Sequence, residues 1–255
     1  MKIVSLHSGG KDSNFNLLKC VENGHEIVAL ATLCPADIIL DSNSYMYQTI
    51  ATNHVHYQAE AMKLPLFKKK ITGSSIDISL NFDQHSETDE DEVYDMMNLI
   101  RQVKLAHQIE AVSTGAIASN YQRSRVSYVC ERLDLDMINY MWGRDQRQLL
   151  TEMIESGCQA ILVKVSSLGL QPMKHIGKTI LELSDHFDYL NKLYGFNVCG
   201  EGGEYETFTL FCPRLFKQRL KIVNSETVCE SKSKEFCQVG YLRINQIQLI
   251  DDNPA

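Results

Sequence analysis

Short apolar runs alternate with helical patterns along the first half of the chain. The candidate strands are residues 3–6, 27–33, 66–72 and 111–113. The candidate helices are residues 11–21, 45–63, 93–103 and 119–133. Strands that alternate with helices through short connections form βαβ units with right-handed crossovers, so the strands lie parallel. We therefore predict the α/β class, with a Rossmann-like, nucleotide-binding domain over residues 1–130.

The pattern changes after about residue 134. Apolar runs at 138–142, 160–165 and 208–211 indicate strands, and residues 144–157 and 176–194 carry helical spacing. Residues 219–250 are also strand-like. We predict a second, smaller α/β domain over residues 131–255, which binds the substrate.

Residues 7–13, His-Ser-Gly-Gly-Lys-Asp-Ser, lie between the first strand and the first helix. A strand, a glycine-rich turn and a helix aim backbone N–H groups and a helix N-terminus at one small volume, which favours an anion. Gly9 and Gly10 let the backbone approach a phosphate without a Cβ in the way. We call residues 7–13 the phosphate loop.

The side chains of the phosphate loop suit a nucleotide. Ser8 and Ser13 offer hydroxyls and Lys11 a cation. A carboxylate beside phosphates, such as that of Asp12, is expected to hold Mg²⁺. Because Lys11 is followed by Asp12, the loop is not G-x-x-x-x-G-K-[ST]. It resembles the loop of the PP-loop ATP pyrophosphatases, which split ATP between the α- and β-phosphates.

Two further segments carry candidate chemistry. In residues 115–125 a glycine ends a strand, Ser119 can cap a helix, and two arginines share one helical turn, where they would suit a phosphate or carboxylate or simply lie on the surface. Residues 199–208, C-G-E-G-G-E-Y-E-T-F, combine three glycines with three carboxylates. They predict a backbone that a ligand can approach closely, or alternatively a hairpin loop. Cys199 has no paired base and is expected to be packed rather than nucleophilic.

Composition narrows the class of partner. The 255 residues are 44% hydrophobic and 22% charged with net charge −7, which argues against nucleic acid as a partner. The eight cysteines form no C-x-x-C and are expected to be reduced thiols. The sequence offers no targeting segment and no apolar run of about 18 residues, so we predict a cytoplasmic protein without a membrane segment. The acidic residues 83–92 are expected to be a loop that runs into a helix.

Together, Ser8–Ser13, Gly115–Arg125 and the 199–208 segment resemble the diphthine–ammonia ligase family, a branch of the PP-loop superfamily. Residues 41–49 resemble a further family stretch. The resemblance implies the last step of diphthamide synthesis. In that step the diphthine carboxylate on translation elongation factor 2 becomes an amide, with ATP, Mg²⁺ and ammonium. Asn120 departs from the expected S-D-Y-Q-R pattern. If that Asp coordinated a metal, Asn120 would weaken the site, whereas an Asp that only capped the helix would be replaced at little cost.

The resemblance also implies a set of site residues. The catalytic residues are Lys11, Asp12 and Arg123, with Asp12 also the metal ligand. The ATP-binding residues are Ser8, Gly9, Gly10, Lys11, Asp12, Ser13, Ala31, Leu33 and Gly115. The substrate-binding residues are Tyr45, Gln48, Ser119, Asn120, Tyr121, Arg123, Arg125, Glu201, Gly202, Gly203, Glu204, Tyr205 and Glu206.

Two alternatives stay open. A tRNA-modifying PP-loop enzyme would be expected to carry a C-x-x-C or a reactive cysteine pair and a basic surface, and the sequence offers neither. A non-catalytic nucleotide-binding module is the other. Asp12 and the glycine–carboxylate segment argue against it, because binding alone needs neither.

Overall fold

The computed structural model describes residues 1–34, 51–76, 79, 82, 91–230 and 239–251. Tyr45 and Gln48, the 41–49 stretch and most of the acidic residues 83–92 lie outside the described residues. No helix in the described ranges is both long and apolar enough to cross a membrane.

The first half of the chain forms a five-stranded parallel sheet in the order β3-β2-β1-β4-β5. Its strands are β1 Lys2–Leu6, β2 Glu26–Cys34, β3 Leu66–Lys70, β4 Ala111–Ser113 and β5 Asp136–Ile138. Its helices are α1 Lys11–Glu22, α2 Val55–Met62, α3 Glu92–His107 and α4 Asn120–Arg132, with a short 3₁₀ turn η1 at Thr52–His54. The predicted parallel α/β fold is confirmed.

The second half forms a four-stranded antiparallel sheet in the order β7-β6-β9-β8. Its strands are β6 Gln159–Val165, β7 Tyr205–Phe211, β8 Gln218–Cys229 and β9 Gly240–Asp251. Its helices are α5 Gln146–Glu155, α6 Pro172–His175 and α7 Ile180–Tyr194. A capping box of Thr179 and Glu182 fixes the start of α7.

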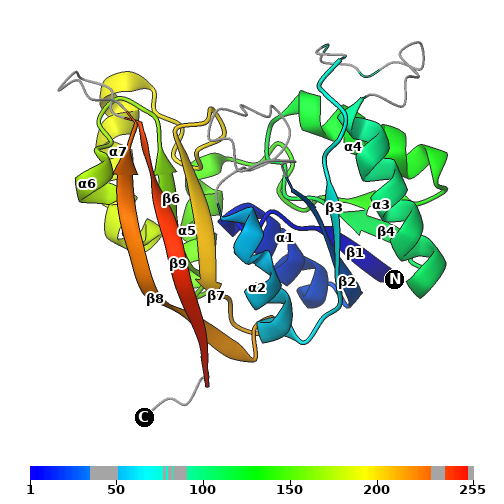
Figure 1. Cartoon of the computed structure of the whole chain (residues 1–255). Helices are drawn as coiled ribbons and strands as arrows, with labels where there is room; N and C mark the ends of the chain where they lie inside the picture. Colours follow the sequence, from blue (N-terminus) through cyan, green and yellow to red (C-terminus); the bar gives the residue numbers. More distant parts are fainter. Residues whose placement is uncertain (35–50, 77–78, 80–81, 83–90, 231–238, 252–255) are drawn as a thin grey trace.

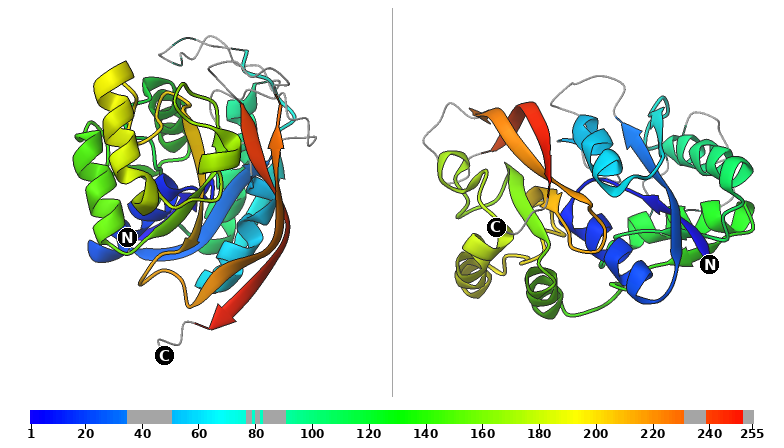
Figure 2. Two further views of the ribbon diagram at one scale, coloured as in Figure 1. Left: turned by 90° about the vertical axis from the view of Figure 1, so that its left-hand side faces the viewer. Right: turned by 90° about the horizontal axis from the view of Figure 1, so that it is seen from below.

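Helix α1 is packed between the two sheets (Figures 1 and 2). Eight of its twelve residues are buried, because it meets β1 and β4 on one side and β7 on the other. One hydrophobic cluster accordingly runs from Ile3 and Phe15 through to Phe208 in the second sheet. A second cluster fills the opposite face of the first sheet under α3 and α4. The two sheets therefore share a core.

Three expectations differ from the structure. The strand expected at 138–142 is β5, Asp136–Ile138, and residues 139–142 turn away. It pairs with β4, so the first sheet extends past residue 130. Residues 45–50 of the expected helix 45–63 lie outside the described residues. From residue 51 on, Ala51 has φ +65°, a 3₁₀ turn follows it, and α2 begins at Val55.

The expectation that all cysteines are reduced was wrong for one pair: Cys158 and Cys212 form a disulfide. The sequence separation of 54 hides their proximity. Cys158 immediately precedes β6 and Cys212 immediately follows β7, and Gln159 pairs with Phe211 in the antiparallel register. The two cysteines are therefore brought together by strand pairing.

Candidate functional site

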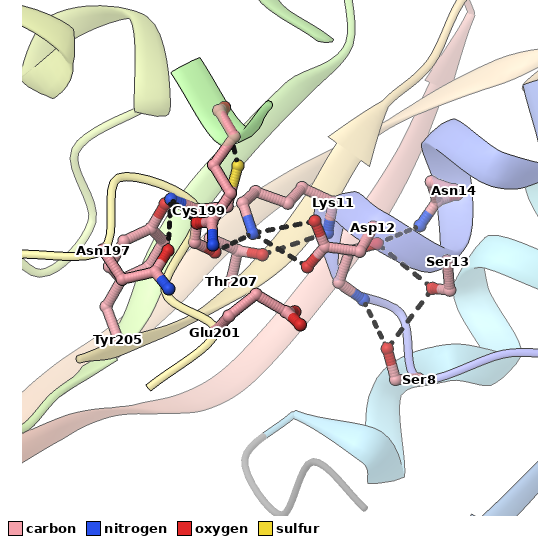
Figure 3. Close-up of polar contacts among 12 residues, drawn as sticks. Ser8, Lys11, Asp12, Ser13, Asn14, Asn197, Cys199, Glu201, Tyr205 and Thr207 are labelled. Carbon is pink, nitrogen blue, oxygen red and sulfur yellow. Dashed lines mark hydrogen bonds and ion pairs between the residues drawn. The ribbon is translucent and has the colours of Figure 1, made fainter. Parts of the chain in front are cut away.

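The phosphate loop connects β1 to α1 and is closed by its own side chains. The Ser8 hydroxyl accepts from the Gly10 N–H at 3.3 Å and lies 3.3 Å from the Ser13 hydroxyl, which donates to the Gly10 carbonyl at 3.2 Å. These short-range bonds fold the loop around the N-terminus of α1, where unpaired N–H groups favour an anion (Figure 3).

Two glycines are required by the geometry of this loop. Gly9 has φ +86°, a conformation that other residues adopt only with strain. A Cβ on Gly115, which follows β4, would lie 2.7 Å from the Ser13 nitrogen, so only glycine lets the two segments approach this closely. Gly10, by contrast, has φ −77° and ψ 172°, which any residue can adopt.

A cavity of about 460 Å³ opens beside the phosphate loop. Its other wall is residues 199–206, which we call the Gly–Glu loop. The cavity brings together many of the predicted site residues: Ser8, Lys11, Asp12, Ser13, Ala31, Leu33, Gly115, Ser119, Glu201, Gly202, Gly203, Tyr205 and Glu206. The first sheet contributes the carboxyl ends of its strands to this wall, which is where ligands bind in open parallel sheets.

Lys11 joins the two loops. Its Nζ lies 2.8 Å from the Asp12 carboxylate and donates to the Cys199 carbonyl (Figure 3). Burial lowers the pKa of Lys11, but Asp12, Tyr205 and Cys199 together outweigh burial, so the pKa is raised overall and the ammonium stays charged. Burial raises the pKa of the Cys199 thiol to about 12, as expected for a packed rather than nucleophilic cysteine.

Glu201 lies across the cavity from the phosphate loop. Its Oε2 accepts from the Ala118 N–H at 3.0 Å, which ties the Gly–Glu loop to the segment between β4 and α4. Burial and the nearby Asp12 charge raise the pKa of Glu201. The wall at this point is therefore acidic and suits a cation.

The other residues of the Gly–Glu loop have separate partners. Glu204 accepts from the Asn197 N–H at 3.1 Å and from the Gly202 N–H at 2.8 Å, so it shapes the loop. Glu206 pairs with Lys164 at 3.1 Å. The buried Tyr205 donates its hydroxyl to the Val198 carbonyl at 2.6 Å and stacks on Phe187.

Three predicted site residues of α4 are not among the residues that line this cavity: Tyr121, Arg123 and Arg125. Arg125 is fully buried, donates to the Ser79 and Tyr121 carbonyls at 3.1 Å, and lies over the Tyr121 ring. Exposed Arg123 stacks on Trp142, with its guanidinium 4.4 Å from the ring centroid. Both arginines therefore have structural partners here, and their contact with a ligand stays a prediction.

Ser119 and Asn120 divide their roles at the start of α4. The Ser119 hydroxyl caps the helix by accepting from the Gln122 N–H at 3.3 Å, as its position predicts. Asn120 is exposed, is absent from the cavity wall and does not provide the cap. Replacement of the expected Asp by Asn therefore leaves the cap in place.

The residues around Asp12 fit Mg²⁺ only in part. Mg²⁺ is commonly held by one or two carboxylates together with substrate phosphates. Asp12 and Glu201 both reach the cavity and could supply such oxygens. Within the described ranges no group of three His, Cys, Asp or Glu side chains forms a ready-made metal site. A metal here would therefore depend on the phosphates of a bound nucleotide.

Among the buried wall residues to which sequence reasoning gave no individual role are His7 and Thr207. Each flanks a motif that was recognised: His7 precedes the Ser-Gly-Gly run and Thr207 follows Glu206. Only their position could have identified them, because a residue that adjoins a motif at the end of a strand lies at the same edge of the sheet as the motif.

Comparison with known proteins places the chain in a family. Residues 1–137 match the diphthamide synthase N-terminal domain and residues 145–250 the diphthamide synthase C-terminal domain. Three of the proteins named diphthine–ammonia ligase are similar along nearly their whole length. The Danio rerio protein is 50% identical, covering 98% of this chain and 97% of its own. The Mus musculus and Homo sapiens proteins are 47% and 46% identical, covering 98% of this chain and 92% and 93% of theirs. The resemblance seen in the sequence and the prediction of a ligase are thus confirmed, and this chain belongs to the diphthine–ammonia ligase family.

Proposed function

We propose that this chain uses ATP to join ammonium to the carboxylate of diphthine on translation elongation factor 2, giving diphthamide, AMP and pyrophosphate in the cytoplasm. The observation that carries the proposal is the shared cavity. An anion-binding helix start forms one wall and a carboxylate-bearing glycine loop forms the other. Such a cavity can hold the phosphates of ATP and a cationic substrate side by side.

The phosphate loop would bind the leaving pyrophosphate. The amides of Asp12 and Ser13 and the hydroxyls of Ser8 and Ser13 would donate hydrogen bonds to it, while Ala31 and Leu33 at the end of β2 would contact the adenine. The diphthine carboxylate attacks the α-phosphorus, the bond to pyrophosphate breaks, and an acyl-adenylate results. Mg²⁺, held by Asp12 and the phosphates, would neutralise charge on them.

The Gly–Glu loop would bind the second substrate. Diphthine carries a trimethylammonium group beside the carboxylate that reacts, and carboxylates attract such a cation. Glu201 and Glu206 reach the cavity and would hold it or the incoming ammonium. Ammonia then attacks the acyl carbon, the bond to AMP breaks, and the amide forms. Lys11, buried between the two loops, would keep them at a fixed separation.

The test is to follow the products of ATP labelled at the α-phosphorus. The reaction would contain the chain, ammonium chloride and elongation factor 2 that carries diphthine. The matched control is the same factor already carrying diphthamide. We expect labelled AMP only when the diphthine form and ammonium are both present. Labelled ADP, or AMP formed equally with the amidated factor, would contradict the proposal.

A further inference from the structure

Strand β7 of the second sheet contacts the phosphate loop through two hydrogen bonds. The Lys11 N–H donates to the Thr207 hydroxyl at 3.0 Å, and the Thr209 N–H donates to the Gly9 carbonyl at 2.9 Å. Both threonines are buried. The backbone on each side of Gly10 is therefore held by β7, almost 200 residues away in the sequence.

A side chain from α2 reinforces this contact. The Gln58 amide nitrogen donates to the Gly9 carbonyl at 2.9 Å and to the Thr209 carbonyl at 2.7 Å. Since that nitrogen is the donor, Gln58 Oε1 is the acceptor for His7 Nε2–H at 2.7 Å. The Gly9 peptide is thus fixed from two sides, in the positive-φ conformation that turns the loop.

The Lys11 amide is the first N–H of α1 and sets the direction of the amides after it. The N–H groups of Asp12 and Ser13 have no acceptor in the part of the chain that the structure describes, and both residues line the cavity. Their alignment depends on the peptide before them. A donor array that is already aligned binds an anion without ordering cost.

We propose that Thr207 is a positioning residue for ATP: its hydroxyl holds the Lys11 peptide so that the next amides of α1 face the phosphates. This inference rests on the proposed function, because it takes the phosphates to lie at the start of α1. ATP affinity would then depend on contacts from the second sheet as well as on the first sheet. Thr207 acts through Lys11 and does not itself take part in bond making.

The chain offers a matched control two residues along the same strand. Among the described residues, the Thr209 hydroxyl is buried with no hydrogen-bond partner. Thr207→Val and Thr209→Val therefore remove the same group from the same strand, and only the first removes a bond to the phosphate loop. Thr207→Ser retains the hydroxyl and serves as the rescue variant.

The experiment measures ATP dissociation constants by calorimetry and melting temperatures for the wild type and the three variants. We expect Thr207→Val to bind ATP about tenfold or more weakly, since an unpaired buried N–H reorients the loop, while Thr209→Val and Thr207→Ser stay near the wild type. Equal affinity of the two valine variants would overturn the inference. So would a serine variant as weak as the valine variant.

Two further outcomes are also decisive. If Thr207→Val does not fold, Thr207→Ala takes its place against Thr207→Ser, with the same expected difference. If the wild type itself binds no ATP, the proposed function fails, and this inference with it. A wild type that binds ATP, with Thr207→Val unchanged, leaves the proposed function standing and removes only the role of Thr207.

Discussion

The two glycine-rich loops that face each other across the cavity differ in how their own side chains are used. In the phosphate loop the serines bond within the loop, and among the described residues the amides of Asp12 and Ser13 have no acceptor, which leaves them for a ligand. In the Gly–Glu loop three carboxylates spaced two or three residues apart have three unrelated partners: the Ala118 amide, the loop's own backbone and Lys164. The serines close the first loop locally, although β7 and α2 also hold its backbone. The carboxylates of the second loop instead reach partners in three different places.

The largest expected effect comes from an alanine substitution at Gly115, beside the phosphate loop, compared with the same substitution at Gly203 in the Gly–Glu loop. Gly115→Ala places a Cβ 2.7 Å from the Ser13 nitrogen and 2.8 Å from the Asp12 carbonyl carbon, so the start of α1 must shift. We expect a stability loss of about 3 kcal/mol and loss of measurable ATP binding. Urea unfolding and ATP calorimetry measure the two effects.

Gly203→Ala is the control from the Gly–Glu loop. Gly203 has φ +82°, and its added Cβ would have nothing within 4 Å. Only the backbone strain remains, about 1–2 kcal/mol, and ATP binding should persist. If both variants bind ATP equally well, the close approach of Gly115 to the phosphate loop does not matter for the nucleotide.

The next prediction distinguishes the roles of two carboxylates of the Gly–Glu loop, Glu201 and Glu204. Glu201→Gln keeps an acceptor for the Ala118 N–H but removes the charge from the cavity, so we expect kcat for amidation to fall about 100-fold with an unchanged melting temperature. Glu204→Ala removes the acceptor of the Asn197 and Gly202 amides. It should abolish amidation and lower the melting temperature, while ATP still binds. Steady-state kinetics and thermal unfolding give both quantities.

Two results would contradict the roles given to Glu204 and Glu201. A Glu204→Ala variant with full amidation would mean that the shape of the loop is not set by Glu204. A Glu201→Gln variant with normal kcat would show that the charge of Glu201 plays no part in the reaction.

The smallest expected effect concerns His7, the first residue of the phosphate loop. Burial lowers its pKa to about 4 from the ordinary 6.5, an effect that its bond to Gln58 only partly offsets. The unfolded chain then binds a proton that the folded chain does not, so His7 weakens the fold as the pH falls from 6.5 toward 4. Between pH 7.5 and pH 5 this amounts to about 2 kcal/mol.

The measurement is urea unfolding of the wild type and His7→Gln at both pH values. The variant should lose about 2 kcal/mol less than the wild type over this interval. His175, whose pKa burial also lowers to about 4, contributes equally to both proteins and cancels. Parallel losses in the two proteins would show that His7 is not buried in its neutral form.

The predicted elements of the first sheet were largely right because each depends on near neighbours. Apolar runs of strand length and helical spacing specify β1, α1, β2 and β4 locally, and the Gly9 turn follows directly after β1. The sequence was less informative where a long-range contact decides. β5 ends before the apolar residues that suggested a longer strand, and a 3₁₀ turn occupies Thr52–His54, where a continuous helix was expected.

By itself, the sequence determined the alternation of strand and helix, the phosphate loop at the end of β1 and the family. Backbone propensity and glycine placement act over a few residues, so these features are visible in a linear pattern. Only the tertiary structure decided which side chains meet. It buried Arg125 away from the cavity, directed Glu204 to its own loop, paired Cys158 with Cys212 and laid Thr207 against Lys11. Those contacts depend on the register of the second sheet and its packing against α1, which no local pattern specifies.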